Sequence, residues 1–171
     1  PPITPQERTE FIPLSFAQQR LWFLDQLIPD TALYNTPIAL RLKGLFNIMA
    51  LENALNILVD RHESLRTTFP PMDGEAHQVI LDNFKINLEE HSQNLTSLDK
   101  EEITSLVEKL AQEEATEPFN LSTGPLLRVK LLKLNQEEHV LLITMHHIIS
   151  DAWSMGIFFK ELSALYNAFA E

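Results

Sequence analysis

Two neighbouring apolar runs in the last third of the chain constrain the fold most strongly. They cover residues 126–134 and 139–145, and the polar residues 135–138 join them as a hairpin connection would. The second run is apolar at both alternating sets of positions, which is typical of a central strand buried on both faces. We therefore expect a layered fold with this strand inside it.

Hydrophobic periodicity predicts the other elements. Helical spacing of apolar residues indicates helices over about 15–28, 47–63 and 99–117, and a last helix after residue 151. Alternating runs predict a strand over 34–42 and a hairpin from 66–69 and 77–81, while the proline-rich residues 1–14 show no periodicity. The order β-α-β-β-α-β-β-α indicates an α+β sandwich with a mixed sheet. The last helix should bury its apolar side chains, which are Ile157, Phe158, Leu162, Leu165, Tyr166 and Phe169.

Composition excludes several classes of protein. The chain has 171 residues, 44% of them hydrophobic, which is enough to form a core. Its net charge of −11 argues against binding to nucleic acid or to an anionic membrane surface. It has no cysteine, so disulfides, thiolate catalysis and cysteine zinc sites are excluded. No apolar stretch approaches the roughly 18 residues of a membrane span and no signal peptide is evident, so we expect a cytoplasmic protein.

Charge and chain ends suggest a surface helix and a fragment. Residues 89–117 carry a net charge of −7, which we interpret as a solvated helix face. The chain opens on Pro1 rather than Met, and a helical pattern is still running at Ala170. We therefore expect these 171 residues to be one piece of a longer polypeptide.

The stretch that follows the second apolar run carries the candidate chemistry. His146 and His147 stand at the end of the predicted strand, and Asp151 follows at the start of a helix, where the dipole favours a carboxylate. Neighbouring side chains on a strand point to opposite faces, so the two histidines are badly placed to share one metal ion. We expect no metal. Two ordinary histidines at a strand end remain the alternative interpretation.

Four stretches in order resemble motifs of the condensation domains of nonribosomal peptide synthetases. Residues 14–24 are similar to the opening SxAQxRLWxL motif, and 61–69 to the RHExLRTxF motif. Residues 117–128 contain the similar EPFNL and GPLLR segments, and 146–151 match the HHxxxD part of the HHxxxDG motif. The matches reach across most of the chain, and the first motif resembles the type that joins an L-configured donor to an L-configured acceptor.

The resemblance implies a fold, an activity and partners. It implies the two-layer sandwich of chloramphenicol acetyltransferase, with helices packed on a mixed sheet, and residues 1–171 as the N-terminal lobe of a two-lobed domain. Such domains form a peptide bond between aminoacyl or peptidyl thioesters carried on the phosphopantetheine of donor and acceptor carrier proteins, and they bind no cofactor directly. The C-terminal lobe, which would be a further partner, is absent from the chain. We expect the isolated lobe to be inactive and to self-associate weakly through the surface left uncovered.

The resemblance also assigns residues. His147 matches the catalytic histidine, which acts as a general base or positions the amine. His146 and Asp151 would support the site, and Arg66 would form a buried ion pair with Asp151. Ala152 stands where the family usually has glycine, so a Cβ would narrow the passage there. The candidate substrate-tunnel residues are Ala152, Trp153 and Ser154.

Two other functions remain open. A non-catalytic binding module of the same fold would bind carrier or tailoring proteins, although such modules usually have a broken histidine motif. A free-standing acyltransferase that uses coenzyme A thioesters would belong to the same superfamily, although the first two motifs weigh against it.

Overall fold

A mixed four-stranded sheet forms the centre of the molecule. The computed structural model describes residues 12–89 and 91–170. The strands are β2 (Asn35–Lys43), β6 (Ser92–Asn94), β7 (Leu127–Lys133) and β8 (Glu138–His146), in the order β2-β8-β7-β6. β8 pairs antiparallel with both neighbours, and β6 runs parallel to β7. The predicted mixed sheet and the 126–134/139–145 hairpin are confirmed.

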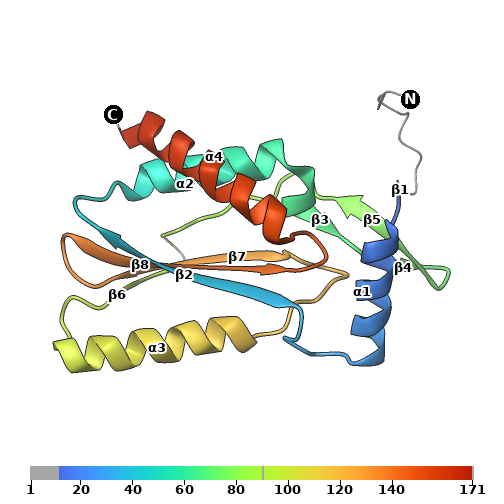
Figure 1. Cartoon of the computed structure of the whole chain (residues 1–171), viewed down its shortest axis with the longest axis horizontal. Helices are drawn as coiled ribbons and strands as arrows, with labels where there is room; N and C mark the ends of the chain where they lie inside the picture. The colour runs from blue at the N-terminus through green and yellow to red at the C-terminus, as the bar shows by residue number, and fades with distance from the viewer. Residues whose placement is uncertain (1–11, 90, 171) are drawn as a thin grey trace.

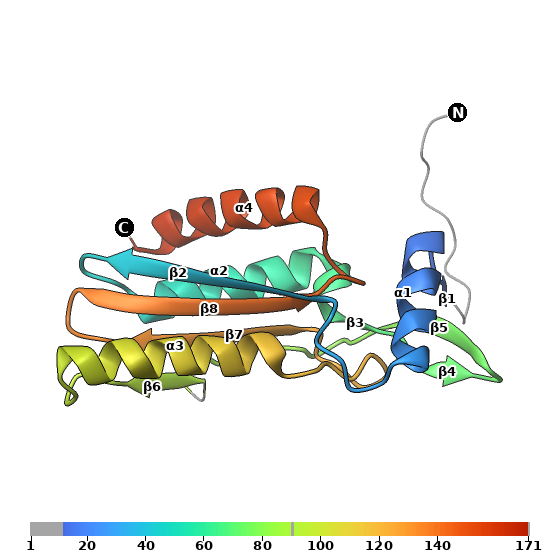
Figure 2. The ribbon, with the colours of Figure 1, turned by 60° about the horizontal axis from the view of Figure 1, so that its bottom comes forward.

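Helices cover both faces of this sheet. α2 (Ile48–Arg61) and α4 (Ala152–Ala170) pack together on one face, and α3 (Lys100–Thr116) lies on the other (Figures 1 and 2). β8 is buried along almost its whole length, as its two-sided apolar pattern predicts. The predicted sandwich corresponds to the sheet with α2 and α4, and α3 adds a helix on the second face.

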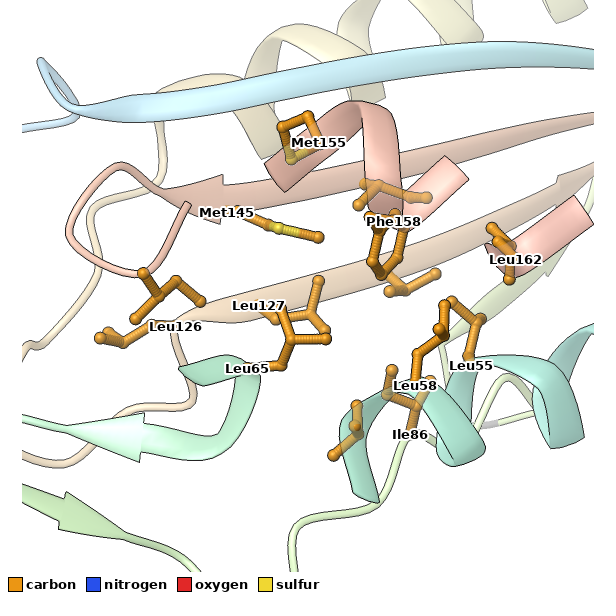
Figure 3. Packing of buried hydrophobic residues seen from close by; sticks show 14 of the residues in the cluster. Leu55, Leu58, Leu65, Ile86, Leu126, Leu127, Met145, Met155, Phe158 and Leu162 are labelled. Atoms are coloured by element: carbon orange, nitrogen blue, oxygen red, sulfur yellow. The ribbon is translucent and has the colours of Figure 1, made fainter. Parts of the chain in front are cut away.

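The alternation along β8 divides the core in two. Leu141, Ile143 and Met145 join the larger cluster on the side of α2 and α4, and Figure 3 shows Met145 there near Phe158. Side chains at the even positions, such as Leu142, join a smaller cluster under α3. Burial of each such side chain contributes about 1.5–3 kcal/mol, so the strand that carries the histidine pair is held from both sides.

A second, smaller sheet stands beside the main one. It contains β1 (Ile12–Pro13), β3 (Thr67–Thr68), β4 (Pro71–Met72) and β5 (Glu75–Ile80), and a 3₁₀ turn, η1 (Glu63–Arg66), leads into it. β3 and β5 confirm the predicted hairpin, whereas β1, β4 and the short β6 were not predicted. The proline-rich segment lies mostly outside the described residues, since only its last three belong to them.

Helix α1 (Phe16–Leu27) stands at the end of the sheet near this second unit (Figure 2). Its predicted capping box is present, because Ser15 accepts from the main chain of Gln18 and the Gln18 side chain accepts from Ser15. The indole Nε1 of Trp22 donates to the carbonyl of Phe69 at 3.2 Å. No residue of α1 is fully buried, and Phe23 is 61% exposed.

The last helix departs from expectation at two positions. Phe158 and Leu162 are buried as predicted, but Ile157 and Phe169 are exposed. They lie off the contact with α2, whereas Met155, which was not predicted, is buried on that side. Within the described residues, no helix is long and apolar enough to cross a membrane.

Candidate active site

His146 is the last residue of β8 and is only 2% exposed. Its Nδ1 accepts a hydrogen bond from the main-chain N–H of Ile148 at 3.1 Å, so this nitrogen carries no proton. Burial, and then the neighbouring His147, lower the pKa of His146 to about 4. The rings of Tyr34 and Phe119 meet it edge-on. His146 is thus a neutral residue that holds the turn after the strand.

That turn places His147 at the surface. The main-chain N–H of His147 donates to the carbonyl of Tyr34 at 2.9 Å, and its imidazole Nδ1 lies 2.6 Å from the carbonyl of Ser150. A carbonyl only accepts, so Nδ1 must carry a hydrogen. In the neutral ring, Nε2 then has a free lone pair, and it has no hydrogen-bond partner among the residues that the structure describes. This tautomer can accept a proton at Nε2.

Asp151 caps helix α4. Its Oδ1 accepts from the main-chain N–H of Ser154 at 2.8 Å, and the Ser154 Oγ accepts from the main-chain N–H of Asp151 at 2.8 Å. These bonds from Ser154, and more weakly the proximity of His147, hold the pKa of the exposed Asp151 carboxyl below its usual value. The reciprocal cap fixes the direction in which α4 leaves the histidine turn.

An open groove of about 460 Å³ lies in front of His147. One wall is the turn 147–151 with Ser154, and the other is the start of α1, from Ser15 to Leu21. Of the candidate tunnel residues, Ser154 lines this groove. Ala152 and Trp153 do not, and both are exposed, Trp153 by 82%.

Arg66 does not form the predicted ion pair with Asp151. Its Nη1 donates to the carbonyl of Leu81 at 2.8 Å, and its Nη2 lies 3.7 Å from Glu63. Asp151 is engaged in the cap of α4 instead. The prediction of this pair was wrong because local main-chain groups occupy both partners.

Two features of the site were not predicted. The N-terminal turn of α1 forms a groove wall, which only the resemblance of 14–24 to an opening motif could have suggested. His62 bonds Glu161 at 2.8 Å and so joins the end of α2 to α4 behind the histidine turn. No group of three or more His, Cys, Asp or Glu within 12–89 and 91–170 is arranged to hold a metal ion.

Comparison with known proteins identifies the family. The condensation domain family model matches residues 8–171. The chain belongs to the condensation domain family.

Curated relatives of this condensation domain are large synthetases. It is 51% identical over 170 residues to a linear gramicidin synthase of Brevibacillus parabrevis, covering 99% of this chain and 2% of the synthase. It is 42% identical over 157 residues to a phosphinothricin tripeptide synthetase of Streptomyces viridochromogenes, covering 92% of this chain and 14% of that protein. The chain therefore spans a small fraction of its curated relatives.

Solved structures confirm the fold. The X-domain from teicoplanin biosynthesis, determined in a complex with OxyB, is 34% identical with a TM-score of 0.84, covering 99% of this chain and 35% of that one. The starter condensation domain of rhizomide synthetase is 25% identical with a TM-score of 0.81, covering 95% of this chain and 38% of that one. These matches confirm the chloramphenicol acetyltransferase-like α+β fold.

Proposed function

We propose that this chain is the N-terminal lobe of a condensation domain that forms peptide bonds between carrier-bound thioesters, with His147 as the proton acceptor or amine-positioning group. One observation supports this proposal most directly. The Ser150 carbonyl holds the proton of His147 on Nδ1, so Nε2 is left unprotonated beside an open groove. A general base needs this arrangement.

The proposed reaction is acyl transfer from sulfur to nitrogen. The amine of the acceptor attacks the thioester carbonyl of the donor, the C–N bond forms, and the C–S bond breaks. Nε2 of His147 takes a proton from the attacking nitrogen, and the leaving thiolate receives one, so charge and atoms balance. General-base assistance of this kind contributes about 10²–10⁴ in rate. His146 and Asp151 support the reaction only by holding the turn and α4.

The partners follow from this chemistry. Donor and acceptor carrier proteins would each present a phosphopantetheine thioester, and a C-terminal lobe would form the opposite wall of the groove. No directly bound cofactor and no metal are part of the proposal. We also propose that the domain acts in the cytoplasm, and that the lobe alone has no condensation activity.

Substitution of His147 in a complete two-lobed domain tests the proposal. We expect His147→Ala to lower dipeptidyl product on the acceptor carrier by at least about 10²-fold, measured by mass spectrometry. His91→Ala is the matched control, because His91 is exposed and does not line the groove. Turnover close to wild type in His147→Ala would contradict the catalytic assignment.

A binding module without catalysis is the second candidate. The observation that favours it is the 34% identity to an X-domain determined together with OxyB. In that case, the His147→Ala domain would retain its partner binding, and the wild type would form no amide from either carrier-bound or coenzyme A-bound donors. The same assay with coenzyme A donors alone separates the coenzyme A-dependent acyltransferase from both.

A further inference from the structure

The main chain of the histidine pair is held from two sides. The N–H of His146 donates to the carbonyl of Leu126 at 3.0 Å, and the N–H of His147 donates to the carbonyl of Tyr34 at 2.9 Å. Leu126 directly precedes β7, and Tyr34 directly precedes β2. Since these strands flank β8 on opposite sides, their separation sets where the two histidines stand.

The end of α3 connects the two flanking strands. Nδ2 of Asn35, the first residue of β2, donates to the carbonyls of Ala115 and Glu117, both at 2.9 Å. Nη2 of Arg128, in β7, donates to the carbonyls of Glu114 at 3.0 Å and Glu117 at 2.8 Å. The Glu117 carbonyl is therefore a shared acceptor that links β2 to β7. Carbonyls at a helix C-terminus lack intrahelical donors, so they are available for this role.

Arg128 is itself held rigidly. Its Nε donates to the carboxylate of Glu114 at 2.6 Å, and Glu114 is 1% exposed. Burial alone would raise the pKa of Glu114, but the bonds from Arg128 and Lys130 outweigh it and lower the pKa of this carboxyl. The guanidinium also lies 3.8 Å from the ring centroid of Phe119, whose ring meets His146 at an interplanar angle of 87°.

From this geometry we infer that Asn35 and Arg128 are positioning residues for His147. Neither lines the groove, and both act through the shared Glu117 carbonyl and the two strands that hold the histidine main chain. The inference rests on the proposed function of His147, but its structural part can be measured without catalysis.

Amide hydrogen exchange in the 171-residue chain tests the structural part. Asn35→Ala and Arg128→Lys should each raise the exchange rates of the His146 and His147 amides by about tenfold relative to the Ile143 amide in central β8. Lysine keeps the charge of Arg128 but cannot donate to the same set of carbonyls. The Ile143 amide corrects for global destabilisation, so a variant that is merely less stable gives no relative change.

Two controls match these variants. Asn56→Ala removes a similar amide clamp, which bonds the main chain of Ile86 outside the main sheet. Lys130→Met removes the second cation on Glu114 without touching the Glu117 carbonyl. Neither control should change the relative exchange of the two histidine amides. An unchanged ratio in both Asn35→Ala and Arg128→Lys, or an equal rise in the controls, would overturn the inference.

Kinetics in a complete domain complete the test. Both positioning variants should lower kcat by about tenfold with KM nearly unchanged, because the proton acceptor is displaced while the carrier surfaces stay intact. A change in KM alone, with kcat intact, would refute a positioning role. If exchange responds but His147→Ala remains active, the proposed function fails while the structural link between the strands stands.

Discussion

At the residue scale, the two adjacent histidines differ because one is buried and the other is exposed. The sequence predicts opposite directions for their side chains, since neighbours on a strand alternate. It also supports His146 as a packing residue, which its burial confirms. The tautomer of His147 could not be predicted, because it depends on the Ser150 carbonyl and hence on the shape of the turn.

The buried His146 predicts an acid-sensitive fold. Its pKa is about 4 in the folded chain against 6.5 for an ordinary histidine, so between these values the unfolded chain binds a proton that the folded chain does not. The stability from neutral His146 is therefore complete above pH 6.5 and falls by about 1.4 kcal/mol per pH unit below it, reaching a loss of about 3 kcal/mol near pH 4. Urea unfolding over a pH series from about 7.5 down to about 5 measures this slope.

His146→Asn provides the comparison for that slope. Asparagine can still accept from the N–H of Ile148 but does not titrate, so the variant should be less stable at neutral pH and have a flatter pH dependence. Burial also lowers the pKa of His139, so part of the slope should persist in the variant. Identical slopes in the two proteins would show that His146 is accessible to protons in the fold.

At the scale of elements, periodicity located the helices and the long strands, and capping motifs located two helix starts. The boxes at Ser15 and Asp99 form as their sequences predict, because a cap is a local arrangement. β6 was missed because its three exposed polar residues show no alternation, and its pairing with β7 is a tertiary contact. Glu114 was placed on a solvated face, yet it is buried against Arg128 and Lys130, which lie on a strand.

The cap at the start of α4 predicts a local role for Asp151. Asp151→Ala should lower the Tm by about 2–4 °C, which is the usual effect of losing a cap in a chain of this size, while Asp151→Asn, which still caps, should remain close to wild type. Differential scanning calorimetry measures both. A loss as large in Asp151→Asn as in Asp151→Ala would indicate that the charge rather than the cap matters.

The same geometry predicts that Arg66 and Asp151 act independently. Arg66 contacts the carbonyl of Leu81 and Asp151 contacts Ser154, so the two side chains share no partner. The stability effects of Arg66→Ala and Asp151→Ala should therefore add in the double variant. Clear non-additivity in a double-mutant cycle, measured by denaturant unfolding, would restore the ion pair that the sequence suggested.

At the scale of the whole molecule, the described residues leave an apolar stripe on α1 uncovered. Phe16, Phe23 and Leu27 are 90%, 61% and 64% exposed, and their spacing of seven and four residues places them on one side of the helix. The core is otherwise closed, and β8 is covered on both faces. Exposed apolar stripes of this kind mark surfaces that contact another protein or another copy of the chain.

We therefore predict that the 171-residue chain self-associates weakly through this stripe. The net charge of −11 opposes association at low salt, so light scattering should show a larger mean mass as salt screens the charge and as concentration rises. Phe23→Glu should weaken association by at least about tenfold, since a carboxylate cannot be buried unpaired at the contact. Leu45→Glu is the matched control, because Leu45 is also a large exposed apolar residue but does not belong to α1. A strictly monomeric chain at high salt and high concentration would show that the stripe stays in solvent, and equal effects of the two variants would locate the contact elsewhere.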